Sequence, residues 1–161
     1  MPSTHAANAL RAVSVAYAGI GLVWATIAFA PIDAPGRLFT DLLDWPLDGV
    51  PATLDPLERW THAVGAGLLV ALAVAFALVV APAVECGDRQ AVRGAALALG
   101  AWYVIDTAGA VANGMGSVGW NTLFLLGWAV PLLLARHGIG EPGAQRSSSG
   151  DAPPRARSGG A

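Results

Sequence analysis

The stretch HAVGAGLLVALAVAFALVVA, residues 62–81, decides the fold of this chain. Apart from His62 at its start, it contains no residue with a titratable side chain. The hydrocarbon core of a bilayer is about 30 Å thick, and an α-helix of roughly 20 apolar residues is long enough to cross it. The stretch therefore predicts a membrane-spanning helix, and the rest of the chain is interpreted around it.

The composition of the whole chain supports an integral membrane protein. Of its 161 residues, 55% are hydrophobic and 12% are charged, whereas a soluble domain usually carries about 25% charged residues. The net charge of -2 is too small to indicate nucleic acid or acidic macromolecules as partners. The partner that the composition does imply is the lipid bilayer itself.

Three further stretches are long and apolar enough to span a membrane. We expect an all-α bundle of four transmembrane helices at about residues 12–30, 60–84, 94–112 and 118–135. This membrane domain, residues 12–136, follows an N-terminal segment of residues 1–11 and includes an outer loop at 31–59. Residues 137–161 are rich in Gly, Ser, Pro and Arg, and this composition predicts a disordered tail.

The first span also has a feature of a signal peptide, because residues 28–30 read Ala-Phe-Ala, a small-residue pattern typical of cleavage sites. The apolar run before it is longer than the usual core of a signal peptide, and Pro31 would follow the cut. We therefore expect this segment to remain as an uncleaved span.

Several helix ends are marked by their residue types. Asp55, Pro56 and Glu58 predict a helix start, with Asp55 as N-cap and Glu58 completing a capping box. Residues 113–117, Asn-Gly-Met-Gly-Ser, predict a tight turn between the third and fourth spans, because Asn and Gly tolerate positive φ. Pro131 falls inside the fourth span, where it should either kink the helix or leave one backbone carbonyl without its donor.

The arginines predict the orientation of the bundle, since cytoplasmic loops carry an excess of positive charge. With four spans, one side holds Arg11, Arg89, Arg93, Arg136, Arg146, Arg155 and Arg157. The opposite side holds only Arg37 and Arg59. Both termini are therefore expected in the cytoplasm, with the 31–59 loop and the 113–117 turn outside.

The outer loop contains a short amphipathic stretch at residues 37–45, RLFTDLLDW. On a helix, its apolar side chains share one side, and these are Leu38, Phe39, Leu42, Leu43 and Trp45. Such a helix lies in the membrane interface in many proteins, with the Trp at headgroup depth. Three roles remain open for it: packing on its own protein, covering a ligand site as a lid, or binding a partner.

Asp106 is the residue with most chemical meaning, because carboxylates are rare inside membrane spans and usually have a partner. It lies in AWYVIDTAGAVANG, residues 101–114, and roughly 9 Å below the outer end of the third span. Helical spacing places Tyr103, Gly109 and Asn113 on the same face as Asp106.

Other polar residues are expected at the same depth, in the outer half of the bundle. The candidate ligand-binding set is Asp106, His62, Asn121, Tyr103, Asn113 and Arg59. His62 reaches Asp106 only if the second span packs beside the third, and we expect this packing because the loop between the two spans is short. Arg59 could extend toward Asp106 from the rim, because long basic side chains place their charge at the interface.

Three interpretations of Asp106 follow from this placement. It is held by Asn121, Thr122 or Arg59 and fixes helix register, or it lines a pocket open to the periplasm, or it carries protons. The first favours a non-enzymatic structural or accessory membrane component. The alternative is a periplasm-facing binder or enzyme for a small lipid-like ligand that uses Asp106, His62 and Asn121.

The chain offers little for metal or cofactor chemistry. It has one cysteine, Cys86, and three histidines, and these show no spacing typical of a metal site. We therefore expect no catalytic residue, no metal and no cofactor.

Gly67, Ala71 and Ala75 form a ridge of small residues on the second span. We interpret this ridge as intramolecular helix packing, although it also suits a homo-oligomer or another membrane-protein partner.

Several short motifs resemble a known group of proteins. These are LLDWPLDG (42–49), Arg-Trp (59–60), WYVIDTAGAVANG (102–114) and Asn121. They are similar to motifs of an uncharacterised family of small bacterial four-span inner-membrane proteins, over most of residues 12–135. The resemblance implies a location in the bacterial inner membrane. It implies no catalytic residue.

Overall fold

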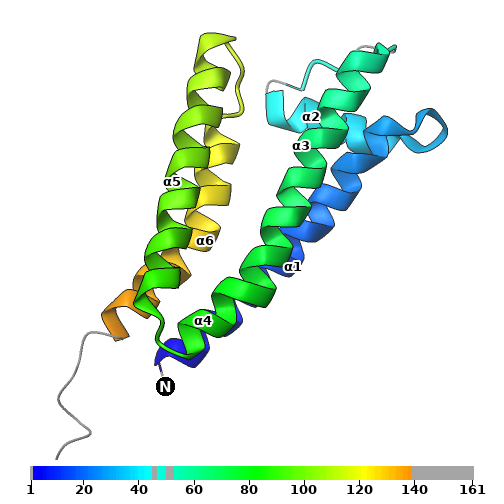
Figure 1. Ribbon diagram of the computed structural model, residues 1–161. Coiled ribbons are helices and arrows are strands. Elements are labelled where there is room, and N and C mark those ends of the chain that lie inside the picture. The colour runs from blue at the N-terminus through cyan, green and yellow to red at the C-terminus, as the bar shows by residue number, and fades with distance from the viewer. Residues whose placement is uncertain (1, 45–46, 50–52, 139–161) are drawn as a thin grey trace, which may run out of the picture.

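The computed structural model describes residues 2–44, 47–49 and 53–138. Within these ranges every regular element is a helix, which confirms the all-α prediction (Figure 1). In chain order the elements are α1 (Pro2–Ala25), η1 (Thr26–Ala28), η2 (Ala30–Ile32), α2 (Ala34–Asp44), α3 (Pro56–Ala75), η3 (Phe76–Val80), α4 (Ala81–Glu85), α5 (Arg89–Ala112) and α6 (Val118–Gly138). The predicted tail falls outside the described residues, apart from its first two positions.

Four segments are long and apolar enough to cross a membrane, as the sequence predicted. They are Thr4–Ala28, Pro56–Glu85, Arg89–Ala112 and Val118–Arg136. The chain is therefore a multi-pass membrane protein with a four-helix bundle. The fifth longer helix, α2, has 11 residues and is too short to cross a bilayer.

α1 begins at Pro2, well before the predicted start of the first span at residue 12. The added turns are helical because they have a packing surface: Ala7 and Leu10 are fully buried in the core. Arg11 then makes a two-pronged ion pair with Glu85 of α4, with N–O distances of 2.7 and 2.8 Å. The N-terminal residues are thus part of the bundle and continue the first span.

The second span runs through α3, η3 and α4. Asp55 caps its start, and the predicted capping box with Glu58 is present in both directions. Pro82 has no backbone N–H and cannot donate to the turn before it. The helix widens there into one π-helical turn, in which the Ala81 N–H donates to the Phe76 carbonyl.

α5 and α6 form a helical hairpin. The Asp88 side chain caps α5 by accepting from the backbone N–H groups of Gln90 and Ala91. At the other end, Gly114 takes a φ of 69° and allows the predicted tight turn into α6. α6 continues past Pro131, which is buried.

The bundle consists of two pairs of helices joined along α1. α1 packs on α3, α4 and α6, whereas α5 packs mainly on α6 and meets the second span chiefly at η3 and α4. Figure 1 shows α5 and α6 diverging from α1 and α3. We name the two ends of the bundle by their contents: the "α2 end" holds α2 and the 113–117 turn, and the "terminal end" holds the start of α1 and the end of α6.

Aromatic side chains form the centre of the core. Trp128 is fully buried, stacks on Phe76 at 4.8 Å between ring centroids, and meets the edge of Tyr17 at 4.7 Å. Its indole N–H donates to the Ser14 hydroxyl at 3.1 Å. The buried Ser14 thus satisfies the one polar atom that this large side chain brings into the core.

The small-residue ridge of α3 does not pack inside the molecule. Gly67, Ala71 and Ala75 are all exposed, so the interpretation of this ridge as intramolecular packing is wrong. α3 turns a neighbouring face toward α1, on which Ala66 and Ala73 are buried. Gly21 of α1 lies close to Ala66 and Val70, and this face therefore provides the close helix contact.

Candidate functional site

α2 folds back onto the α2 end of its own chain. Its Phe39 ring lies between Trp24 of α1 and Trp120 of α6, at centroid distances of 5.9 and 6.4 Å. The Trp120 indole N–H donates to the Leu42 carbonyl at 2.7 Å. Of the three roles considered for this helix, the structure directly supports packing on its own protein. Trp45 lies outside the described residues.

Arg59 does not extend toward Asp106. Its guanidinium donates to the Asp33 carboxylate at 2.9 Å and to the Ile27 carbonyl at 2.8 Å. Arg37 donates to the same Asp33 oxygen at 3.1 Å. These contacts tie the start of the second span to the loop that follows α1, and the arginine is already satisfied there.

The two arginines lower the pKa of Asp33 from its ordinary value of 3.8, with the hydrogen bond from Arg59 as the largest cause. A lowered native pKa stabilises the fold above the unfolded-state pKa of about 4, and this contribution is lost as the pH falls below it. We expect the gap in melting temperature between the wild type and Asp33→Asn, measured in detergent, to be constant from pH 7 to 5 and to shrink below about pH 4. A gap that does not narrow in acid would show that Asp33 contributes no charge-dependent stability.

His62 and Asp106 are not brought together. The His62 ring is half-buried and lies against Trp24 of α1, with ring centroids 6.0 Å apart. α3 and α5, the helices that carry the two residues, make at most marginal contact. The expectation that a short loop would place these helices side by side is not met, because α1 and α6 lie between α3 and α5 at this end of the bundle.

Asp106 is exposed on α5, and no described residue forms a hydrogen bond or an ion pair with it. Two of the partners expected for it are engaged elsewhere: Arg59 binds Asp33, and the Thr122 hydroxyl binds the Tyr103 hydroxyl at 3.0 Å. The side-chain N of the third, Asn121, donates no hydrogen bond to it. The first interpretation, an Asp106 held inside its own bundle, is therefore wrong for the described part of the chain.

The other polar residues of this region serve the hairpin itself. The Asn113 side-chain amide donates to the Gly109 carbonyl at 2.8 Å and so closes the last turn of α5. The bond between Tyr103 and Thr122 links α5 to α6. These contacts fix the hairpin and leave the carboxylate of Asp106 outside it.

Two buried polar atoms of the α5–α6 hairpin lack a hydrogen bond within the described residues. They are the side-chain N of Asn121, a residue that is only 5% exposed, and the hydroxyl of Thr107. Buried polar groups without partners are uncommon in native proteins. The α2 end of the hairpin therefore has polar capacity that its own side chains do not use.

One face of α5 changes its surroundings along its length. At the terminal end of this face Ala95 is buried, and farther along Trp102 packs against the core. Asp106, Gly109 and Asn113 continue the same face by helical spacing and are all exposed. We call these last three residues the "Asp106 face". No other helix covers this face among the described residues, because α3 diverges from α5 toward the α2 end (Figure 1).

Sequence reasoning missed two features. Asp33 and Arg37 stand four residues apart, a spacing that predicts a helical ion pair, but the contribution of Arg59 from the distant second span has no local signal. The second is a groove between α5 and α6, with Arg93 and Arg136 in its lining, which the apolar sequence of the two helices does not indicate. Within the described residues, no group of three or more His, Cys, Asp and Glu side chains is placed to hold a metal ion.

Comparisons with protein-family models, with curated proteins and with solved structures find no match to this chain.

Proposed function

We propose that this protein is a non-enzymatic accessory component of a membrane assembly, and that it binds a transmembrane helix of a partner along the Asp106 face. One observation carries the proposal: a carboxylate within a membrane span is exposed and has no partner among the described residues. Ionisable side chains inside membranes are expensive and as a rule face a protein neighbour or water.

Asp106 lies inside the hydrocarbon core, where an exposed carboxylate is unfavourable. α5 has 24 residues and is about 36 Å long, so it exceeds a hydrocarbon core of about 30 Å by roughly 3 Å at each end. Asp106 precedes the end of the helix at Ala112 by six residues, or about 9 Å, which places it about 6 Å inside the hydrocarbon. Facing lipid alone at that depth would be unfavourable for the carboxylate.

The chemistry of the Asp106 face indicates the kind of partner. The partner helix supplies a basic side chain or another hydrogen-bond donor at this depth, because an ionised carboxylate only accepts hydrogen bonds. Gly109, on the same face, has open space around its Cα, and small residues let helices approach closely. A second copy of the chain fits less well, since pairing this face with itself brings two carboxylates together.

The alternative, a ligand site built from Asp106, His62 and Asn121, needs the three side chains around one pocket. His62 lies against Trp24 of α1, the Asn121 side chain is buried, and Asp106 is exposed on α5. This separation supports the accessory role over a catalytic or ligand-binding one.

As part of the same proposal, we place the protein in a bacterial inner membrane with the terminal end in the cytoplasm. The excess of arginine on that side supports this orientation, and the motifs shared with small bacterial four-span proteins agree with the location. A reporter fused after Arg136 tests the orientation: cytoplasmic activity is expected, and periplasmic activity would reverse it.

Cysteine crosslinking in native membranes tests the proposed interface. In a Cys86→Ser background, Gly109→Cys places a thiol on the Asp106 face. We expect a short bifunctional crosslinker to join this cysteine to one other membrane protein and to give one discrete product. Ala108→Cys is the matched control, because Ala108 is exposed at the same depth but is turned by about 200° from Asp106 along the helix.

The crosslinked products distinguish the possible occupants. One product from Gly109→Cys that is absent from Ala108→Cys supports the proposal. A product with twice the mass of the chain would show a homodimer and overturn the proposed partner. Equal products from both positions, or none from either, would show that the Asp106 face is not an interface.

A further inference from the structure

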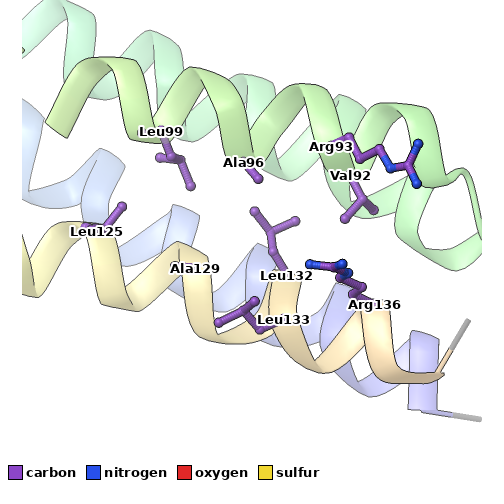
Figure 2. Close-up of a pocket in the computed structure, with 10 residues that line it drawn as sticks. Val92, Arg93, Ala96, Leu99, Leu125, Ala129, Leu132, Leu133 and Arg136 are labelled. Carbon is purple, nitrogen blue, oxygen red and sulfur yellow. The ribbon is translucent and has the colours of Figure 1, made fainter. Parts of the chain in front are cut away.

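The terminal end contains a groove between α5 and α6 that is separate from the Asp106 face. It has a volume of about 280 Å³. Small residues create it: Ala96 and Gly100 on α5 face Ala129 on α6 across the hairpin, and a Cβ added at Gly100 would meet no atom within 4 Å. Figure 2 shows the helices separated here, with leucine side chains along the sides.

The groove is apolar along its length and basic at one end. Leu99, Leu125 and Leu133 are among its walls. Arg93 of α5 and Arg136 of α6 line the groove from its two sides where it meets the terminal end (Figure 2). Within the part of the chain that the structure describes, no acidic side chain lines the groove. Glu85, an acid at the same end, is occupied by its ion pair with Arg11.

The dimensions correspond to one lipid chain in one leaflet. On α6 the lining extends from Leu125 to Arg136, which is about 16 Å of helix. One leaflet contributes about half of the 30 Å hydrocarbon core. The two guanidinium groups therefore lie near the depth of the headgroups, and the apolar walls lie at the depth of the acyl chains.

We propose that this groove binds an anionic phospholipid, with one acyl chain between α5 and α6 and its phosphate between Arg93 and Arg136. Arginine suits phosphate because its planar guanidinium donates two parallel hydrogen bonds. Basic pockets between transmembrane helices are a recurring form of lipid-headgroup recognition. A zwitterionic lipid would fill the same apolar walls and has the same phosphate, but the positive group of its headgroup neutralises that phosphate and is repelled by the two guanidinium groups.

Native mass spectrometry of the purified full-length protein tests this proposal. The protein is delipidated and mixed with equal amounts of dioleoyl-phosphatidylglycerol and dioleoyl-phosphatidylcholine, which share their acyl chains. We expect one phosphatidylglycerol to be retained in preference to phosphatidylcholine. In the double variant Arg93→Gln/Arg136→Gln this preference should fall by roughly 25-fold, since each basic residue contributes about a factor of five near an anionic lipid.

Three further samples make the result specific. Arg89→Gln removes a positive charge from the same end without touching the groove and should bind as the wild type does. Ala96→Leu fills the groove from an exposed position and should reduce retention of both lipids. Inorganic phosphate at millimolar concentration should not displace the lipid, because the acyl chain contributes most of the contact.

Three results of these binding measurements would contradict an anionic-lipid site. Equal retention of the two lipids by the wild type, or unchanged preference in the double variant, would overturn the proposal. Displacement by inorganic phosphate would show a simple anion site. Should the double variant unfold, Arg93→Lys/Arg136→Lys keeps both charges, and it should still prefer phosphatidylglycerol with weaker binding. A folded lysine variant that retains the two lipids equally would also contradict the proposal.

Discussion

Gly36→Ala should destabilise the protein by about 2 to 4 kcal/mol, a large effect for one methyl group. A Cβ at Gly36 would lie 2.5 Å from the Ile27 nitrogen and 2.8 Å from the Trp24 carbonyl oxygen. Both atoms belong to the backbone and cannot rotate away. The substitution must therefore move α2 off the end of α1, and it breaks the bond from the Gly36 N–H to the Thr26 hydroxyl.

The consequence of Gly36→Ala should extend beyond the clash itself. α2 carries Phe39, which packs between Trp24 and Trp120, and Leu42, whose carbonyl accepts from Trp120. Undocking α2 removes these contacts together. Exposed loop sites should then become sensitive to protease before the bundle itself unfolds.

Thermal unfolding in detergent, followed by circular dichroism, measures the effect of Gly36→Ala. Gly19→Ala is the matched control, since a Cβ at Gly19 of α1 meets nothing within 4 Å. Glycine is about 1 kcal/mol less favourable than alanine inside a helix, so the control should keep or raise the melting temperature. Equal melting temperatures for the two variants would show that the contact between α2 and α1 does not contribute to stability.

The elements of this fold could be predicted from the sequence, because hydropathy and caps are local properties. Asp55, Glu58 and Gly114 act at the helix ends as their residue types predict. The lateral order of the helices could not be predicted in this way. Spans are apolar all round, and their periodicity does not say which face meets which neighbour.

The errors at the candidate site follow from that limit. With α3 assumed beside α5, His62 and Arg59 reach the depth of Asp106 and look like its partners. In the structure α1 occupies the inner side of α3, so Arg59 bonds to Asp33 and His62 lies against Trp24. The groove at the terminal end could not be predicted for the same reason. Ala96 and Ala129 are ordinary apolar residues in the sequence, and only the packing of α5 on α6 places them on facing sides of a groove.

Asp106→Leu should distinguish binding of a partner helix by this carboxylate from a structural role within its own chain. Asp106 is exposed, and no described residue bonds to it, so removing its charge costs the isolated protein no contact. Substitutions at such positions usually change stability by less than about 0.5 kcal/mol. The purified variant should therefore melt in detergent at nearly the temperature of the wild type.

The same variant should bind its partner helix weakly. Polar contacts between membrane helices contribute about 0.6 to 2 kcal/mol each, which corresponds to a loss of roughly threefold to thirtyfold in affinity. Ala108→Leu is the control, since it adds apolar volume to the opposite exposed side of α5 and should leave binding unchanged. The two effects together, normal stability and lost assembly, are expected only if Asp106 acts outside its own chain.

The most direct test of the central claim is the fraction of protein that migrates as a complex in native electrophoresis after mild solubilisation of its own membranes. Wild type and Ala108→Leu should migrate with the partner identified by crosslinking from Gly109→Cys, whereas a larger fraction of Asp106→Leu should migrate as the free, folded chain. An unchanged complex in Asp106→Leu, or a free chain that has lost thermal stability, would contradict the claim that Asp106 binds a partner helix.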